Sequence, residues 1–178
     1  MTERSELIEL HNRLSKTLDE ERVAAKEKRH DKGYRTAREN LDDLIDRDSF
    51  VEYGQLAVAA QKSRREIEEL RTETAADGII TGFGKINGDI LQDSKALSAI
   101  IINDYSVLAG TQGYYHHKKL DRICETAEKQ KLPVIMYTEG GGGRPGDTDV
   151  HVQFAGLNIP SFSLSLIHIS EPTRLDHI

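Results

Sequence analysis

Four consecutive glycines are the residues of this sequence whose type and spacing most directly suggest chemistry. They occupy positions 140–143, and with the flanking Glu139 and Arg144 they form a segment that we call the glycine loop, residues 139–144. Glycine permits positive φ angles and lets another group approach the main chain closely. N–H groups that point at one place can hold a phosphate or a developing oxyanion. The segment therefore predicts a binding loop, with a flexible surface turn as the alternative.

The glycine loop does not match the common phosphate-binding motifs. It lacks the Gly-Lys-Ser/Thr ending of a P-loop and the spacing of a dinucleotide fingerprint. It directly follows an apolar stretch, residues 132–137, which we expect to form a buried strand. Ligands in α/β domains bind at the carboxyl ends of strands. We therefore expect a cradle of backbone amides at the end of this strand.

Basic and imidazole side chains gather at the start of a predicted helix, residues 114–131: His116, His117, Lys118 and Lys119. A helix N-terminus attracts anions, so the lysines could meet the phosphates of a cofactor. A solvated helix face explains the same residues equally well. The two histidines are adjacent and point to different sides of the helix, so we expect no shared metal.

The remaining candidate residues favour structural roles. Asp147 and Asp149 are typical of turns, and a carboxylate close to Arg144 would pin the glycine loop through a charge-assisted hydrogen bond. Neither aspartate has the apolar setting of a general acid. Cys124 lies on the predicted buried face of the helix, where a cysteine acts as a small core hydrophobe. No Ser-His-Asp arrangement can be placed.

Composition limits the class of protein. The 178 residues suffice for one domain with a core, and 37% of them are hydrophobic and 30% charged. A net charge of −6 argues against broad nucleic-acid binding. No stretch approaches the ~20 apolar residues that span a bilayer, and the first residues form no apolar signal core. The single cysteine excludes an internal disulfide. We therefore expect a cytoplasmic protein that binds neither nucleic acid nor membrane.

The N-terminal part is predicted to be helical. Leucines at positions 7, 10, 14 and 18 make one narrow helical face within residues 4–29. We expect a solvated helix there, docked on the body of the protein or on a partner chain. Residues 28–35 form a basic connector with a glycine, and a second helix should begin near Thr36. The charged residues 61–76 predict a mobile helix or a surface loop.

The rest of the chain alternates between strands and a helix. We expect strands at residues 49–53, 78–86, 97–102 and 134–137, with Asn87-Gly88 as a hairpin turn signal. Residues 104–113 should form a loop. The helix at 114–131 has one apolar face, made by Leu120, Ile123, Cys124 and Ala127. The fold class is therefore α/β, with a right-handed βαβ unit, a sheet built from residue 78 onward and a helical N-terminal arm.

The last residues do not continue this alternation. Residues 165–174 resemble the translation of a sequencing-adapter read. We therefore expect a truncated gene product with a foreign tail at residues 161–178, which is left out of the fold prediction. The predicted organisation is a helical arm at 1–48, a partial domain at 49–160 and this tail.

Several segments together resemble the carboxyltransferase component of biotin-dependent acyl-CoA carboxylases, of the acetyl- and propionyl-CoA type. Residues 33–41 are similar to the family's Gly-x-x-Thr-Ala-Arg-Glu-Arg-Ile motif, and residues 49–53 to its Ser-Phe-x-Glu strand. Residues 104–113 are similar to the segment that closes its next strand. Residues 132–144 are similar to Pro-Val-x-x-x-x-Asp-Ser-Gly-Gly-Ala-Arg. The resemblance covers roughly residues 5–160.

The glycine loop departs from the common family pattern at three positions. Glu139 stands for the aspartate, Gly140 for the serine and Gly143 for the alanine. This version resembles the branch in which the carboxyltransferase is fused to, or partnered with, biotin carboxylase and biotin-carrier domains. The resemblance implies those partners and a homo-oligomer of the full-length protein.

The resemblance also implies a fold and a reaction. The fold is crotonase-like, built from ββα repeats, and the reaction transfers the carboxyl group of carboxybiotin to the α-carbon of an acyl-CoA. The biotin nitrogen is thought to take the α-proton, which agrees with the lack of a side-chain base. The N–H groups of Gly141 and Gly142 match the family's donors to the enolate oxygen.

The resemblance further implies that Arg144 anchors the loop and that Ala109 and Gly110 line the path of CoA. It implies that Lys118 helps to hold the phosphates of CoA. A second oxyanion donor and the biotin pocket would lie beyond Pro160, so we expect this product to be inactive alone and poorly stable. The competing interpretation is a non-catalytic acyl-CoA-binding or assembly module. A crotonase-type hydratase or hydrolase would need placed carboxylates, which the sequence does not show.

Overall fold

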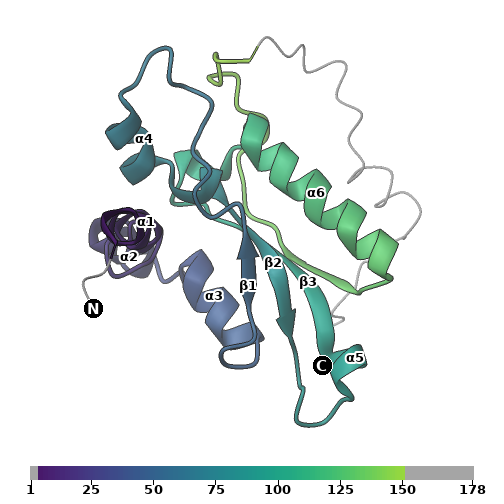
Figure 1. Ribbon diagram of the computed structural model, residues 1–178. Coiled ribbons are helices and arrows are strands. Elements are labelled where there is room, and N and C mark those ends of the chain that lie inside the picture. Colours follow the sequence, from purple (N-terminus) through teal and green to yellow (C-terminus); the bar gives the residue numbers. More distant parts are fainter. Residues whose placement is uncertain (1–3, 151–178) are drawn as a thin grey trace.

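The structure of the protein, a computed structural model, describes residues 4–150 and contains one four-stranded mixed sheet (Figure 1). Its strands are β1 (Val51–Tyr53), β2 (Ile79–Lys85), β3 (Leu97–Asn103) and β4 (Val134–Tyr137), in that spatial order. β2 is antiparallel to both β1 and β3, whereas β3 and β4 are parallel. The predicted strands are confirmed, and β1 joins the sheet that was expected to start at residue 78.

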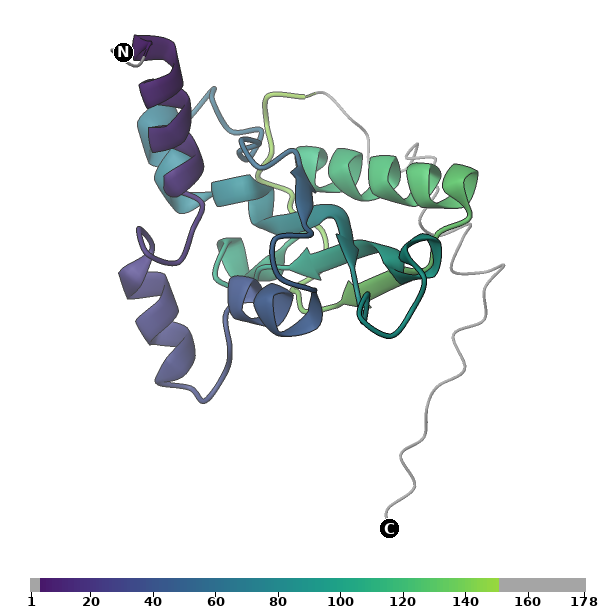
Figure 2. The same ribbon diagram turned by 60° about the horizontal axis from the view of Figure 1, so that its bottom comes forward.

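The sheet is covered on both faces, which gives three layers. Successive side chains of a strand point to opposite faces. One face of β2 and β3 packs on α6 (Tyr114–Gln130) through a cluster of buried residues: Ile79, Ala99, Ile101, Leu120, Ile123, Cys124 and Ala127. The other face packs on α3 (Ala37–Leu44) through Ala37, Leu41, Ile80, Ile100 and Ile102. Figure 2 shows α6 and α3 on opposite sides of the sheet.

Helix α6 agrees with the sequence prediction, and β2 and β3 pair antiparallel, but residues 86–96 connect them in place of a two-residue Asn87-Gly88 turn. The four expected apolar residues of α6 are buried, and burial raises the pKa of the Cys124 thiol to about 11. At the hairpin, Asn87 has a φ of 56°, and the Asp46 carboxylate accepts hydrogen bonds from the N–H groups of Asn87 (3.0 Å) and Gly88 (2.7 Å). The connection then passes through α5 (Asp93–Ala96) into β3.

The first helix predicted for the N-terminal arm, within residues 4–29, is two helices in the structure. α1 (Ser5–Ser15) and α2 (Val23–His30) are separated by turns, and neither helix contains a buried residue. The break follows from Thr17, whose hydroxyl donates to the Leu14 carbonyl at 2.7 Å and whose side chain is buried. Such a side-chain bond to the backbone competes with continued helix. The leucine stripe buries too little surface to prevent it.

Residues 61–76 contain an ordered helix, α4 (Ile67–Glu73), whose Leu70 is fully buried. A 3-10 turn, η1 (Ala75–Gly78), leads from it into β2. Three successive residues of this turn have positive φ: Ala76, Asp77 and Gly78. A second short turn, η2 (Leu108–Gly110), follows β3 and has the same character.

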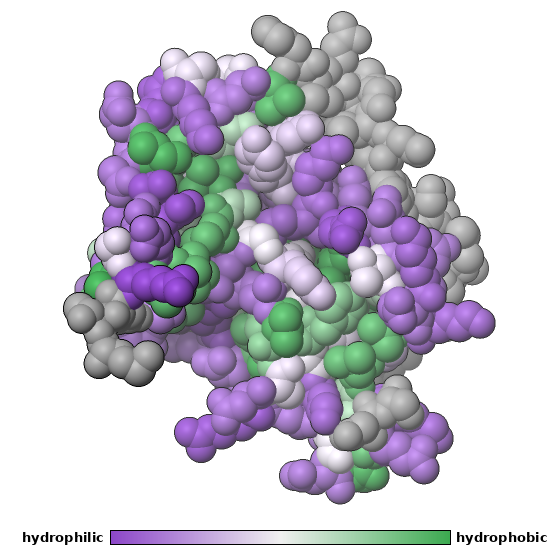
Figure 3. Space-filling model, viewed as in Figure 1, coloured by the Kyte–Doolittle hydropathy of each residue, from purple (hydrophilic) through white to green (hydrophobic). Residues whose placement is uncertain are grey.

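Residues 132–137 were predicted to form a buried strand; the strand is present, but the prediction of burial is wrong. β4 forms, but its Val134, Met136 and Tyr137 are between 39% and 46% exposed. The reason is its place at the end of the strand order, where only β3 pairs with it. Figure 3 shows apolar residues (green) at the surface of the protein among polar ones.

The predicted foreign tail, residues 161–178, lies outside the described residues, as does the end of the predicted domain at 49–160. Within residues 4–150, no helix has both the length and the apolar character needed to cross a membrane.

Candidate functional site

The glycine loop lies against the turn η2, because β3 and β4 are parallel and both segments leave the same edge of the sheet. The two backbones touch. A Cβ atom at Gly140 would overlap the carbonyl oxygen of Gly110, and one at Gly110 would lie 2.5 Å from the carbonyl oxygen of Glu139. Only glycine fits at these two positions, so the sequence at 110 and 140 is required for the approach.

Backbone hydrogen bonds hold the glycine loop beside the segment after η2. The N–H of Gln112 donates to the carbonyl of Gly142, and the N–H of Arg144 donates to the carbonyl of Gln112, both at 2.8 Å. Gly142 has a φ of +90°, which favours glycine. Among residues 4–150, the N–H groups of Gly141, Gly142 and Ala109 have no hydrogen-bond acceptor. The site therefore offers unpaired backbone donors at an exposed loop.

The carboxyl end of the glycine loop is held by Arg144, whose side chain points into the protein and is 5% exposed. Its guanidinium donates to the carboxylate of Asp77, to the carbonyl of Thr111 at 2.6 Å and to the Thr111 hydroxyl at 3.2 Å. Asp77 is fully buried and also accepts the N–H of His116 at 2.7 Å. Arg144 thus ties together the glycine loop, the turn η1 and helix α6.

Burial controls the ionisation of this cluster. Desolvation raises the pKa of the Asp77 carboxyl, and the charge of Arg144 opposes that rise. Desolvation also lowers the pKa of His116 to about 3, so its imidazole is neutral. The Nε2 atom of His116 is buried and has no partner within residues 4–150. These groups form a rigid support and not a proton-transfer chain that reaches the surface.

The N-terminus of α6 has an anion from the protein itself. The carboxylate of Asp147 accepts the N–H of Tyr114 at 2.8 Å and the side-chain amide of Gln61 at 3.0 Å. A cofactor phosphate was one of the two interpretations of this helix end, and Asp147 occupies the place that such a phosphate would take. The predicted proximity of Asp147 to Arg144 is present, with a separation of 3.7 Å between their charged atoms.

The two lysines of α6 differ in environment. Lys119 is buried, and its ammonium donates to the carbonyls of Ala76, at 2.9 Å, and Ile79. Desolvation lowers the pKa of Lys119 to about 8. Lys118 is exposed and lies over the ring of Tyr114, 5.5 Å from its centroid. Lys119 therefore supports the turn η1, and only Lys118 of this pair faces solvent.

A groove of about 1060 Å³ opens between α2, the end of α4 and the segment after β3. We call it the α2 groove. It contains Ala109 and Glu139, so it reaches the glycine loop, and Lys118 is not among its residues. Lys28 and Lys32 line it and have no ion-pair partner within residues 4–150. Its other prominent residues are two exposed tyrosines and a paired arginine: Tyr34, Tyr105 and Arg22.

An ion pair joins the α2 groove to the glycine loop. Arg29 on α2 donates two hydrogen bonds to the carboxylate of Glu139, at 2.7 and 2.8 Å. Its guanidinium carbon lies 5.1 Å from the ring centroid of Tyr34 and 5.6 Å from that of Tyr105. Sequence reasoning missed this pair because the two residues are 110 positions apart. The one hint of this pair in the sequence was the basic character of residues 28–35.

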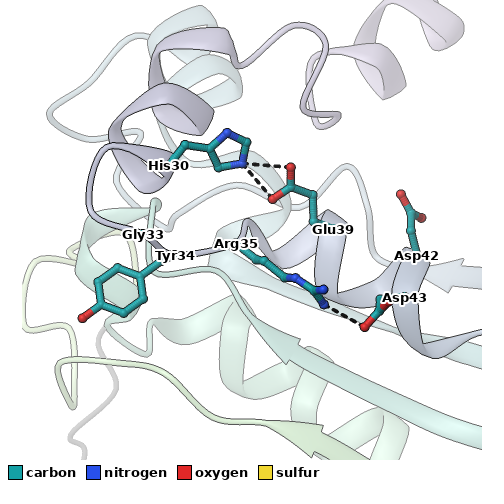
Figure 4. Close-up of a pocket in the computed structure, with 7 residues that line it drawn as sticks. All are labelled: His30, Gly33, Tyr34, Arg35, Glu39, Asp42 and Asp43. Atoms are coloured by element: carbon teal, nitrogen blue, oxygen red, sulfur yellow. Dashed lines mark hydrogen bonds and ion pairs between the residues drawn. The ribbon is translucent and has the colours of Figure 1, made fainter.

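A second hollow, of about 700 Å³, lies where α2 meets α3 (Figure 4). His30 Nε2 lies 2.9 Å from both carboxylate oxygens of Glu39, and Arg35 donates to Asp43 at 2.7 Å. Hydrogen bonds from His30 and from the Thr36 N–H lower the pKa of Glu39. Figure 4 shows Tyr34 turned away from these pairs. The charged groups satisfy one another and fix the junction between the two helices.

The chain matches known proteins over most of its length. The model of the family described as "Carboxyl transferase domain" matches residues 28–157. A biotin-dependent acetyl-/propionyl-coenzyme A carboxylase beta5 subunit from Mycobacterium leprae is 35% identical over 143 residues, which are 80% of this chain and 24% of that protein. The chain therefore spans about a quarter of the length of this curated relative.

Solved structures show the same likeness. A single-chain, multi-domain long-chain acyl-CoA carboxylase matches with a TM-score of 0.83 and 49% identity, over 92% of this chain and 16% of that one. A transcarboxylase 12S structure matches with a TM-score of 0.64 and 24% identity, over 83% of this chain and 27% of that one, which shows the fold alone. The predicted crotonase-like fold is confirmed. The chain belongs to the carboxyl transferase domain family.

Proposed function

We propose that this chain forms the acyl-CoA side of a carboxyltransferase site, which transfers the carboxyl group of carboxybiotin to the α-carbon of an acyl-CoA. One observation carries the proposal. The N–H groups of Gly141 and Gly142 have no acceptor within residues 4–150, and Gly141 lies against Ala109. Ala109 belongs to a groove lined by Lys28 and Lys32, which have no ion-pair partner within the same residues. A thioester bound at the loop would have its CoA portion in that groove.

The chemistry assigned to the loop is stabilisation of negative charge. Loss of the α-proton turns the thioester into an enolate, and backbone donors aimed at its oxygen lower the barrier. One such donor is typically worth about 2.7–4 kcal/mol. Carboxybiotin, when bound, would supply CO2 for the α-carbon and, once the bond to that CO2 has broken, a nitrogen that takes the α-proton. The residues of this chain then bind the thioester and hold the enolate oxygen.

The side chains support that division of roles. The carboxylate of the glycine loop itself, Glu139, is held by Arg29, and His116 is buried with its pKa lowered to about 3. Neither is placed as a general base. This supports a reaction in which the base comes with biotin and not from the protein. The pocket for biotin is assigned to other parts of the complete enzyme.

The α2 groove is the proposed place of CoA. Lys28 and Lys32 would neutralise its phosphates, and the exposed tyrosine rings offer flat apolar surfaces to its base. Ala109 lines the groove where it reaches the loop, and Arg144 acts as the loop anchor. A contribution of Gly110 to the path of CoA stays a prediction, because this residue is buried and lies outside the groove. A contribution of Lys118 to the phosphates stays a prediction, because this residue lies outside the groove.

The partners and the acyl chain are inferred from the relatives. We infer biotin carboxylase and biotin-carrier domains as partners and a homo-oligomer of the complete protein, with a cytoplasmic location. The sequence resembles carboxyltransferases of the acetyl- and propionyl-CoA type and leaves the acyl chain length open. The solved carboxylase with 49% identity is named as acting on long-chain acyl-CoA, which supports long-chain acyl-CoA as a second candidate substrate.

A carboxylation assay tests the proposal. The complete natural polypeptide that contains residues 1–160 of this sequence is supplied with carboxybiotin and with acetyl-, propionyl- or palmitoyl-CoA. We expect carboxylated product, and at least a tenfold rise in the KM for acyl-CoA when Lys28 and Lys32 are both replaced by Ala. Tight binding of acyl-CoA without any carboxylated product would instead favour the non-catalytic acyl-CoA-binding module.

A further inference from the structure

We propose that Arg29 and Glu139 form a clamp that positions the glycine loop for carboxyl transfer; this inference rests on the proposed function. The clamp links the N-terminal helical arm to the first residue of the loop. Arg29 and Glu139 are positioning residues in this account. Neither is assigned contact with the thioester.

The centre of the glycine loop makes few packing contacts, so the loop needs an anchor at each end. Cβ atoms built at Gly142 and Gly143 would meet no heavy atom within 4 Å, so packing does not hold these residues. Arg144 holds the carboxyl end through Asp77 and Thr111. At the amino end, the Glu139 side chain makes its hydrogen bonds to Arg29 alone among residues 4–150.

Contacts other than the bond to Glu139 also hold the side chain of Arg29 in place. Its Nε donates to the Arg35 carbonyl at 3.1 Å, while both terminal nitrogens donate to Glu139. Tyr34 and Tyr105 lie against the guanidinium, and the side chain is 11% exposed. A planar fork that donates two parallel bonds fixes the direction of a carboxylate as well as its distance. Glu139 therefore meets a preorganised partner.

The clamp acts on the backbone of the site through Glu139. The carbonyl oxygen of Glu139 lies against Gly110, where even a methyl group would overlap it. A change in the Glu139 side chain would therefore move the contact between the glycine loop and η2. The bonds that bridge these segments, from the N–H groups of Gln112 and Arg144, would weaken with it.

The hydrogen bonds of Arg29 argue against a role for this residue in binding phosphate. All three guanidinium nitrogens have acceptors in the protein. Lys28 and Lys32 line the same groove, and within residues 4–150 they have no such partners. The lysines are thus assigned to substrate affinity and Arg29 to the geometry of the loop. Replacing the lysines should therefore raise KM, whereas breaking the bond between Arg29 and Glu139 should lower kcat.

The kinetic test compares Glu139→Gln with two other variants of the complete natural polypeptide. We expect Glu139→Gln to lower kcat at least tenfold and to change KM for acyl-CoA less than twofold. Glu139→Asp, which keeps the carboxylate, should recover part of kcat. Asp43→Asn breaks an exposed ion pair with Arg35 and should change neither constant. The clamp would be overturned if Glu139→Gln left kcat unchanged. It would also be overturned if the variant lost activity only because its KM for acyl-CoA had risen.

A second measurement does not depend on activity. In this chain, NMR hydrogen exchange at the N–H groups of Gln112 and Arg144 should rise at least fivefold in Glu139→Gln. The N–H of Asp46, which donates to the Lys85 carbonyl at 2.8 Å far along the chain, serves as the control for global unfolding. Unchanged exchange at Gln112 and Arg144 would refute the clamp. Raised exchange together with an inactive natural enzyme would refute the proposed function and leave the clamp in place.

Discussion

At the scale of single residues, Gly110 and Gly140 are the most constrained positions of the site. Replacing either with Ala puts a methyl group into the opposing backbone, which cannot move like a flexible side chain. We expect Gly110→Ala and Gly140→Ala each to lower the free energy of unfolding by about 1–3 kcal/mol, the usual cost of overpacking. Urea denaturation measures this.

Gly143→Ala is the matched control for those variants. It adds the same methyl group in the same loop, where no heavy atom lies within 4 Å and φ is not positive. We expect a change below about 0.5 kcal/mol, as for ordinary surface substitutions. Equal losses in Gly143→Ala and Gly140→Ala would show that the contact between the glycine loop and η2 is not the cause.

The buried pair of Arg144 and Asp77 gives a second residue-scale prediction. Arg144→Met leaves the Asp77 carboxylate buried without its cation. Removing one partner of a buried ion pair typically costs about 3–5 kcal/mol. The double variant Arg144→Met, Asp77→Asn should lose less than Arg144→Met alone, because no charge is then left unpaired. Strictly additive losses in denaturation experiments would contradict this coupling.

His116 predicts how stability depends on pH. Its pKa in the folded protein is lowered from 6.5 to about 3, so between these values the unfolded chain binds a proton that the folded protein does not. The free energy of unfolding should therefore fall as the pH is lowered from about 6.5 toward 3, by up to about 1.4 kcal/mol per pH unit from this group. His116→Gln should show a shallower slope in urea titrations at several pH values. Identical slopes would contradict the lowered pKa.

At the scale of elements, α3 begins with a reciprocal cap. The Thr36 hydroxyl accepts the N–H of Glu39 at 3.0 Å, and the Glu39 carboxylate accepts the N–H of Thr36 at 2.8 Å. Loss of such a cap costs about 1 kcal/mol. Thr36→Ala should lower the melting temperature accordingly, whereas Thr72→Ala, at an exposed site inside α4, should have a smaller effect. Equal effects would argue against the cap.

The elements that sequence predicted well are those whose signals are local. The apolar spacing of Leu120, Ile123, Cys124 and Ala127 identifies α6 because a helix repeats every 3.6 residues. The break between α1 and α2 was not predictable from the leucine stripe, since it depends on Thr17 being buried by the rest of the fold. The exposure of β4 likewise depends on which strands pair beside it.

At the scale of the whole molecule, parallel β3 and β4 bring η2 and the glycine loop to one edge of the sheet. The position of the site could be predicted, because the glycine loop follows a strand and ligands bind at strand ends. The ion pairs that hold the site in place could not be predicted. Arg144 is 67 positions from Asp77, and Arg29 is 110 positions from Glu139. No periodicity links residues so far apart, and only the tertiary fold pairs them.

The central claim is that the N–H groups of Gly141 and Gly142 receive the thioester oxygen of an acyl-CoA. NMR spectra of the 15N-labelled chain, titrated with a non-hydrolysable acyl-CoA thioether-ketone analogue, test it most directly. We predict that the amide signals of Gly141 and Gly142 shift in a saturable way, together with those of Lys28 and Lys32, while Gly88 at the distant hairpin is unchanged. Saturable binding that leaves both glycine signals in place would contradict the claim.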